Sequence, residues 1–168
     1  MVKLYGGAMT AEIPSVFVDA SKFRPVPDTQ EVFVGRVNNE DVSLIIDLLE
    51  PVEAETPIEA LTAHADEVHR LSSPEKVDTI EVSSQVLNGH HVALRDDVVV
   101  TKEGTTVILF CLIQLKQYKT DLLITTVVQQ RDGELPDDIV SDFSEARAVI
   151  RGFVESYKVI DPRLFKTS

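Results

Sequence analysis

The fold is decided by an unbroken apolar run in the second half of the chain, Val107-Ile108-Leu109-Phe110-Cys111-Leu112-Ile113. Successive side chains of a β-strand point to opposite faces, so a strand that is apolar at every position is normally covered on both sides. Residues 122–128 are almost as apolar. The sequence therefore predicts a sheet whose central strands are buried on both faces.

Strand patterns extend outward from this run over residues 76–130. Asn88-Gly89 and Glu103-Gly104 have the composition of tight hairpin turns, and residues 116–120 form a polar reversal. Because each connection is short, the simplest topology for this half of the chain is an antiparallel meander.

The N-terminal third predicts a second group of extended segments. Residues 31–37 and 42–49 have strand composition and are joined by the turn residues Asn38-Asn39. The preceding residues 24–29 contain two prolines, which restrict the backbone to a rigid extended connection. We therefore expect a hairpin that follows a stiff loop.

Two helices are predicted, one before and one after the meander. Thr56 is suited to cap the first helix, Pro57 to begin it and Glu59 to complete a capping box. Its apolar stripe is Ile58, Leu61, Ala65 and Val68, and it is expected to end near residues 72–74. The stripe of the second helix is Phe143, Ala146, Ile150, Phe153 and Tyr157.

Two helices and a sheet that is apolar on both faces predict an α+β fold, with an antiparallel β-sheet sandwiched between α-helices. A chain of 168 residues fits the usual domain size of about 100–200 residues. The sequence contains no repeat, low-complexity tract or Gly/Ser linker. We therefore expect a single domain over residues 1–168.

The charge balance excludes two classes of function. The chain has 28 acidic and 16 basic side chains, which give a formal net charge of −12. Nucleic-acid binding and attachment to anionic membranes both require an excess of Lys and Arg. The apolar run at 107–113 is far shorter than the roughly 20 residues of a transmembrane helix. We expect an intracellular protein that binds neither nucleic acid nor membrane.

The cysteine and the histidines do not predict a metal or catalytic site. Cys111, the single cysteine, lies in the most apolar strand, so we expect a buried and inert thiol. His64 and His69 are five residues apart and lack the i, i+4 spacing of a helical zinc site, so we expect them on a solvated face. His90-His91 would point to opposite faces of a strand. With no catalytic motif present, an enzyme is not expected.

The negative charge is concentrated in one part of the chain. No Lys or Arg lies between Arg36 and Arg70, but nine acids do: Glu40, Asp41, Asp47, Glu50, Glu53, Glu55, Glu59, Asp66 and Glu67. One interpretation is an ordinary solvated helix face with an acidic loop. The other is a surface that docks on a basic patch of another protein, where charge complementarity speeds encounter and fixes register.

Asp47 and Glu50 end the otherwise apolar stretch 44–50. A separation of three residues in a regular strand would place the two carboxylates on opposite faces. If both serve one site, the chain must bulge or leave the strand between them.

Several distinctive segments are spread over nearly the whole chain: Leu4-Tyr5-Gly6-Gly7-Ala8-Met9-Thr10, Asp19-Ala20-Ser21, residues 24–33, Ile46-Asp47-Leu48-Leu49-Glu50, residues 112–123 and Asp161-Pro162-Arg163-Leu164-Phe165. In sequence and in order, these segments resemble the Mog family of Ran guanine nucleotide release factors. Residues 76–98 contribute little to the resemblance.

The resemblance implies a small nuclear protein, also present in the cytoplasm, that binds the GTPase Ran as a monomer. It would promote release of the guanine nucleotide and support nuclear protein import, with no cofactor and no metal of its own. The implied fold is similar to that of the photosynthetic PsbP proteins. Asp47 and Glu50 carry over as the Ran-binding acids, with Asp28, Glu31 and Arg24 as secondary candidates. For these three the alternative is structural: Asp28 in a turn, and Glu31 with Arg24 as a surface ion pair.

Two other functions stay open on the sequence. The first is a small-ligand-binding or hydrolytic domain, with a pocket between sheet and helices in which His64, His69 or His90 acts on a metabolite. The second is an adaptor that sequesters Ran without releasing its nucleotide.

Overall fold

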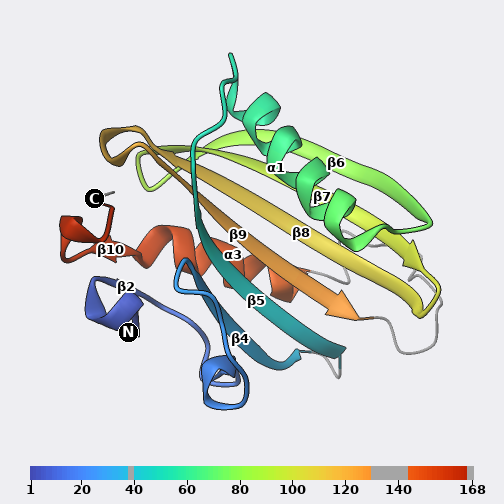
Figure 1. The fold of residues 1–168 in the computed structure, drawn as a ribbon, viewed down its shortest axis with the longest axis horizontal. Helices are drawn as coiled ribbons and strands as arrows, with labels where there is room; N and C mark the ends of the chain where they lie inside the picture. The colour runs from blue at the N-terminus through green and yellow to red at the C-terminus, as the bar shows by residue number, and fades with distance from the viewer. Residues whose placement is uncertain (38–39, 130–143, 166–168) are drawn as a thin grey trace.

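A computed structural model describes residues 1–37, 40–129 and 144–165. The principal strands are β3 (Val18–Asp19), β4 (Gln30–Val37), β5 (Glu40–Leu49), β6 (Lys76–Leu87), β7 (His90–Thr101), β8 (Gly104–Leu115) and β9 (Thr120–Gln129). They form one seven-stranded sheet in the order β3-β4-β5-β9-β8-β7-β6, and all neighbouring pairs are antiparallel. The sheet and its helices are shown in Figure 1.

The remaining elements are smaller, apart from the two helices α1 (Pro57–Ser72) and α3 (Ser144–Ser156). A second sheet has the order β1-β2-β10 and consists of β1 (Val2–Leu4), β2 (Met9–Ala11) and β10 (Lys158–Val159). Short 3-10 helices are η1 (Tyr5–Gly7), η2 (Ala20–Lys22), η3 (Lys116–Tyr118) and η4 (Pro162–Phe165). None of the helices in the described ranges combines the length and apolar character needed to cross a membrane.

The apolar run that predicted the sheet lies in β8, and all seven of its residues are buried. Leu109, Cys111 and Ile113 belong to the hydrophobic cluster under α3. Ile108, Phe110 and Leu112 belong to the cluster under α1. The prediction that the central strands are covered on both faces is therefore confirmed.

The first predicted helix begins as its sequence indicates. Thr56 Oγ1 accepts a hydrogen bond from the Glu59 N–H at 3.1 Å, and Pro57 is the first helical residue. The Glu59 carboxylate accepts a hydrogen bond, also at 3.1 Å, from the N–H of Glu55, the residue before the cap, and not from that of Thr56 as in a regular capping box. The helix ends at Ser72, and Ser73 follows in the left-handed region with φ 48°.

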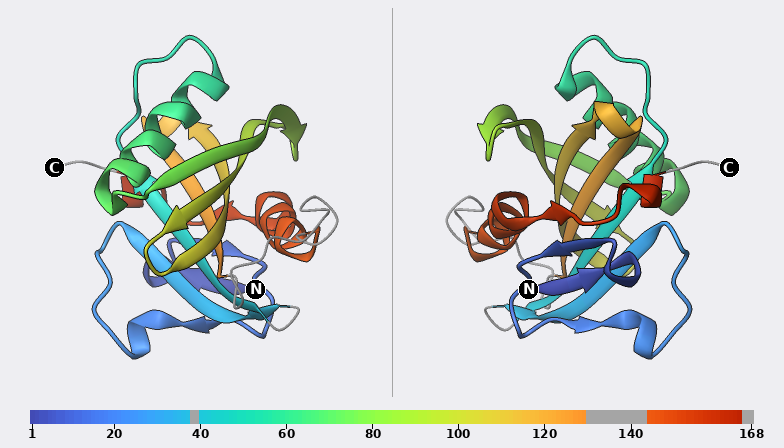
Figure 2. Two further views of the ribbon diagram at one scale, coloured as in Figure 1. Left: turned by 90° about the vertical axis from the view of Figure 1, so that its right-hand side faces the viewer. Right: turned by 90° about the vertical axis from the view of Figure 1, so that its left-hand side faces the viewer.

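The second predicted helix covers the other face. Ile150 and Phe153 of α3 pack in the same cluster as Leu109 and Ile113, together with residues of the small sheet. Phe143, the first residue of the predicted stripe, lies outside the described residues, as does the predicted turn Asn38-Asn39. Figure 2 shows α1 and α3 on opposite faces of the large sheet. The predicted α/β/α arrangement is confirmed.

Candidate functional site

Asp47 lies near the end of β5, between strands β4 and β9. Its neighbours across the sheet are Gln30 and Leu123. Leu44 and Ile46 of the same strand belong to the cluster under α3, so the alternation of side chains places Asp47 on the face that α1 covers. Gln30 Nε2 donates a hydrogen bond to Asp47 Oδ2 at 3.0 Å, which fixes the carboxylate at the surface of the sheet.

Partial burial shifts the pKa of the Asp47 carboxyl. Burial raises its pKa above the ordinary 3.8, whereas the hydrogen bond from Gln30 and the nearby His64 act in the opposite direction. A carboxylate with a raised pKa gains more than a solvated one from a cationic partner, because that partner compensates the hydration it has lost. Asp47 is thus suited to accept a basic group from outside.

Replacing Asp47 with asparagine is expected to stabilise the protein at neutral pH. Because its pKa is raised in the folded state, the carboxyl favours folding when protonated, below pH 3.8, and this contribution is lost as the pH rises through the folded pKa. Asparagine keeps an acceptor for Gln30 and carries no charge to desolvate. We expect a gain of at most about 1 kcal/mol, because partial exposure screens the charge. Thermal melts at pH 7 and pH 3 should show the gain at pH 7 and little difference at pH 3.

Glu50 follows Asp47 beyond the end of the strand. The strand β5 ends at Leu49, and Glu50 is exposed in the segment that leads to α1. The chain therefore leaves the strand between the two acids, which is the condition predicted for both carboxylates to serve one site. Figure 1 shows this connecting segment projecting beyond the sheet next to the start of α1.

Asp28 lies at the same end of the sheet. It occupies a turn closed by the hydrogen bond from the Gln30 N–H to the Pro27 carbonyl at 2.9 Å, which confirms the predicted turn position. The Leu48 N–H donates to the Thr29 carbonyl at 3.0 Å, so this turn runs alongside the end of β5. The structure therefore brings Asp28 toward the end of β5, where Asp47 and Glu50 lie.

Glu31 occupies the opposite face of the sheet. It pairs with Ile46 across the hairpin, and its Oε1 accepts a hydrogen bond from the Tyr5 N–H at 2.5 Å. The pKa of the Glu31 carboxyl is raised above its ordinary value, chiefly by burial. The hydrogen bond from Tyr5 acts in the opposite direction, and the nearby charge of Asp19 adds to the increase. Arg24 is exposed in the loop before β4. The predicted surface ion pair between Glu31 and Arg24 is wrong: within the described chain, the partner of Glu31 is the backbone of Tyr5.

Tyr5 connects the start of β4 to β5 at this end of the sheet, a role that the sequence pattern did not indicate. Its hydroxyl lies 3.0 Å from the Thr29 carbonyl and 3.1 Å from the Ile46 carbonyl. Burial, reinforced by the charges of Glu31 and Asp47, raises the pKa of the phenol above its ordinary value. The hydroxyl therefore remains a neutral donor that holds β4 and β5 together beside Asp47.

Three of the nine acids in the span 37–69 have basic partners in the structure. Arg36 pairs with Asp41 at 3.3 Å, Arg70 with Glu67 at 2.5 Å, and Arg95 of β7 reaches Asp66 at 3.8 Å. Within the residues that the structure describes, the other six acids have no Lys or Arg within 4.0 Å: Glu40, Asp47, Glu50, Glu53, Glu55 and Glu59. Three of these, Glu50, Glu53 and Glu55, lie between the end of β5 and the start of α1, and Asp47 lies just before them near the end of β5.

The prediction that His64 and His69 lie on a solvated face is wrong. Both side chains are buried against the sheet, with 8% and 9% of their surfaces exposed. His64 Nε2 lies 2.7 Å from Asp121 Oδ2, and His69 Nε2 lies 2.7 Å from Asp97 Oδ2. Each histidine thus joins α1 to a buried carboxylate of the large sheet.

The structure also shows where the two other histidines and the cysteine lie. His90 Nε2 is 3.0 Å from the Tyr157 hydroxyl, whereas His91 is exposed on the next position of β7. Cys111 is fully buried, as predicted, and burial raises the pKa of its thiol to about 12. The described residues contain no cluster of three or more His, Cys, Asp or Glu side chains that could hold a metal ion.

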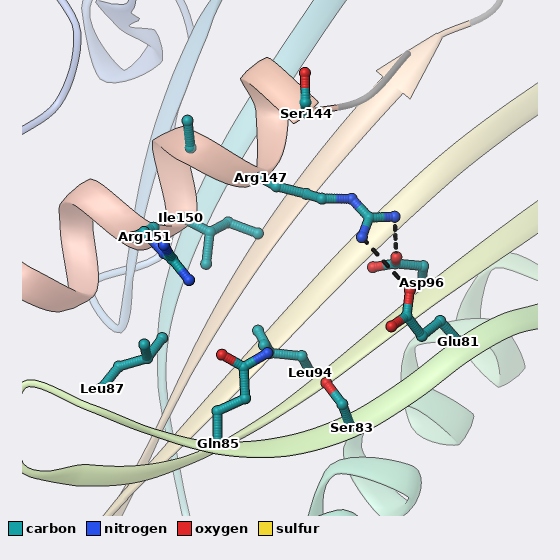
Figure 3. A pocket seen from close by; sticks show the side chains of 11 residues that line it. Glu81, Ser83, Gln85, Leu87, Leu94, Asp96, Ser144, Arg147, Ile150 and Arg151 are labelled. Atoms are coloured by element: carbon teal, nitrogen blue, oxygen red, sulfur yellow. Dashed lines mark hydrogen bonds and ion pairs between the residues drawn. The ribbon is translucent and has the colours of Figure 1, made fainter. Parts of the chain in front are cut away.

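A cavity of about 450 Å³ lies between α3 and the hairpin of β6 and β7 (Figure 3). It lies on the face opposite α1, and none of the residues that line it is a histidine. His64 and His69 are on the other side of the sheet and already bonded to carboxylates. The structure therefore gives no support to the hypothesis of a hydrolytic pocket served by these histidines.

Comparison with known families gives this arrangement a context. The family model described as "Ran-interacting Mog1 protein" matches residues 2–129, which include Asp28, Glu31, Asp47 and Glu50. The chain belongs to the Mog1 family. Among curated relatives, the nuclear import protein MOG1 of Saccharomyces cerevisiae is 32% identical, over 98% of this chain and 84% of that protein. The Ran guanine nucleotide release factor of Bos taurus is 36% identical, over 73% of this chain and 72% of that protein.

Solved structures show the same Mog1 fold. The crystal structure of the Saccharomyces cerevisiae Ran-binding protein Mog1p superimposes with a TM-score of 0.81 at 31% identity, covering 98% of this chain and 97% of that one. The cyanobacterial PsbP protein of Synechocystis matches with a TM-score of 0.52 at 13% identity, covering 90% of this chain and 86% of that one, a likeness of fold alone. The first match agrees with the family expected from the sequence, and both agree with the expected fold.

Proposed function

We propose that this Mog1-family chain binds the small GTPase Ran and promotes release of its guanine nucleotide, in support of nuclear protein import. The observation that carries the proposal is the family match over residues 2–129, which contains the acidic end of β5. The names of two relatives, a nuclear import protein and a Ran guanine nucleotide release factor, support the same function.

We assign the contact with Ran to the acidic end of the sheet, formed by Asp47, Glu50 and the Asp28 turn. Asp47 is held in place by Gln30 and Glu50 is exposed, and neither has a basic partner among the described residues. Such carboxylates are free to pair with Lys and Arg of a partner, which steers encounter and fixes orientation. Glu31, on the other face and bonded to Tyr5, contributes by holding this end together, and Arg24 stays a secondary candidate.

Nucleotide release needs no covalent chemistry in this scheme. A GTPase of the P-loop class holds its nucleotide through a loop lysine on the phosphates and a bound magnesium ion. A carboxylate from the acidic end that pairs with this lysine competes with the phosphates and weakens nucleotide affinity. By linkage, a protein that binds the nucleotide-free GTPase more tightly must loosen the nucleotide by the same factor.

A nucleotide-release assay tests the proposal. Ran loaded with a fluorescent guanine nucleotide is mixed with the chain and an excess of unlabelled nucleotide, and the loss of fluorescence is followed. We expect release to accelerate with chain concentration and to saturate. Binding of Ran without acceleration would support the sequestering adaptor instead, and the absence of binding would contradict both functions.

We further propose that the chain acts as a non-catalytic regulator, binds Ran as a monomer and resides in the nucleus and the cytoplasm. A regulator that competes with the guanine nucleotide for Ran requires only a docking surface. The name of one relative, a nuclear import protein, points to a role in nuclear import. Sedimentation of the mixture with Ran should give a complex with one copy of each chain.

A further inference from the structure

The strand β6 forms the outer edge of the large sheet in the part of the chain that the structure describes. It is 12 residues long and pairs only with β7 in that sheet. A bulge at Ile80 interrupts the ladder, but residues 81–87 pair regularly with β7. The outer stretch Val82-Ser83-Ser84-Gln85-Val86 contains no charged residue and no proline, which natural edge strands use to block pairing with other chains.

The hairpin geometry determines which backbone groups of β6 face outward. Asn88 and Gly89 both have positive φ, 50° and 76°, as in a two-residue type I′ turn. Such a turn is closed by a hydrogen-bonded pair, here Leu87 with His90, and hydrogen-bonded pairs then alternate along the ladder. The N–H and C=O groups of Val82, Ser84 and Val86 therefore point away from β7, toward the free edge.

The side chains of the same three residues form an exposed face. Val82 is 42% and Val86 62% exposed, on the side of the sheet that carries α1. The intervening residues Ser83, Gln85 and Leu87 point to the other side, where they line the cavity beneath α3. A strand added beside β6 would thus cover the two valines with one set of side chains and direct the alternate set toward the cavity.

The cavity contains an arginine that has no acidic partner among the described residues. Arg147 already has acidic partners, because it pairs with Asp96 and lies 3.6 Å from Glu81. Arg151 lies one helical turn further along α3, lines the same cavity and has no carboxylate within 4.0 Å in the described ranges. Figure 3 shows its side chain extending from α3 toward the side formed by Leu87 and Gln85.

We propose that β6 is a docking edge for an extended segment of a partner protein, which adds as an eighth strand and places a carboxylate beside Arg151. The free backbone groups supply the main-chain hydrogen bonds of strand addition, and the cavity selects the alternate side chains. The segment therefore has apolar, β-branched residues on one face and an acidic residue on the other. This edge is separate from the acidic end assigned to Ran, so the two sites can be tested independently.

A second copy of the chain fits this edge less well. Each chain carries a net charge of −12, so two copies repel each other. The stretch 82–86 brings no carboxylate, and Glu81 is already paired with Arg147. Strand pairing between two copies would therefore leave each Arg151 without a partner.

The test uses a probe peptide, acetyl-Ser-Val-Ser-Val-Glu-Val-Ser-Val-Ser-amide, titrated into the full chain and followed by amide NMR and hydrogen exchange. In the free protein, the outward amides of Val82, Ser84 and Val86 should exchange faster than those of Ser83, Gln85 and Leu87. Bound peptide should slow exchange of the outward amides and shift the signals of β6 and of Arg151. If the outward amides are already protected in the free protein, the edge is occupied by the chain itself or by a second copy, and the proposal is wrong.

Two variants separate the backbone and charge contributions. Ser84→Pro removes an outward N–H while leaving the ladder to β7 intact, so the protein should stay folded and lose peptide binding, whereas Ser84→Ala should bind like the wild type. Arg151→Glu should weaken binding of the probe by about tenfold or more. A peptide with Lys in place of Glu should show the reverse preference. Equal affinities for all four proteins, or no dependence on the sign of the peptide charge, would overturn the proposal.

Discussion

Replacement of Asp97 by alanine is expected to lower the free energy of unfolding by about 3–5 kcal/mol. Asp97 is fully buried in β7, with an exposed fraction of 0%. Its carboxylate lies 2.7 Å from His69 Nε2 and accepts hydrogen bonds from Arg95 Nε at 2.8 and 3.1 Å and from Thr79 Oγ1 at 2.8 Å. This one carboxylate therefore joins α1, β6 and β7. Its removal leaves the buried guanidinium of Arg95 and the buried imidazole of His69 without their shared partner.

Thermal and urea unfolding measure this effect. For a chain of this size, about 2–4 °C of Tm corresponds to 1 kcal/mol, so the melting temperature should fall by about 6–20 °C. Asp66→Ala is the matched control: it removes the exposed acid that approaches the same Arg95 at 3.8 Å and should change stability by less than about 0.5 kcal/mol. A loss no larger than that of the control would show that the Asp97 network contributes little to holding α1 on the sheet.

The pairing of buried His64 and His69 with carboxylates of the sheet was not predicted, for a physical reason. Spacing along the sequence shows only that His64 and His69 do not share a metal; it does not show that α1 lies flat on the sheet with both rings facing it. The informative signal was in the strands. Asp97 stands directly before the apolar stretch Val98-Val99-Val100 of β7, and Asp121 directly before the apolar stretch Leu122-Leu123-Ile124 of β9. A carboxylate buried beside such a stretch requires a partner. The helix α1 covers those strands and supplies the partners, His64 for Asp121 and His69 for Asp97.

Much of the candidate site follows from the sequence once the hairpin turn is placed. A turn at residues 38–39 puts Val37 opposite Glu40, and counting back along both strands puts Gln30 opposite Asp47. The same count puts Glu31 opposite Ile46, on the other face. The contact of Tyr5 with Glu31 could not be obtained in this way, because it depends on a distant N-terminal residue with a positive φ of 52°. The importance of Asp47 and Glu50 themselves came from the family resemblance.

The largest functional effect is expected from reversing the charge of both acids at the end of β5. The double variant Asp47→Lys, Glu50→Lys should lose about 2–5 kcal/mol of binding to Ran if the pair is buried at the interface, because it replaces two attractive contacts with repulsive ones. Isothermal titration with Ran measures the affinity, and the release assay should lose its acceleration in parallel. The variant should remain folded, because Glu50 is exposed and Asp47 is only partly buried.

The control for this variant must separate a local site from the general effect of charge on association. Glu75→Lys, Glu103→Lys makes the same change in net charge with exposed residues near the β7 to β8 turn, at the opposite end of the sheet from Asp47. If the acidic end of β5 is the docking site, the control should bind Ran nearly as the wild type does, with a difference that shrinks as salt is raised. Equal losses in both variants would mean that only the overall charge matters. A folded Asp47→Lys, Glu50→Lys variant with undiminished Ran affinity would contradict the assignment of the site while leaving the family membership intact.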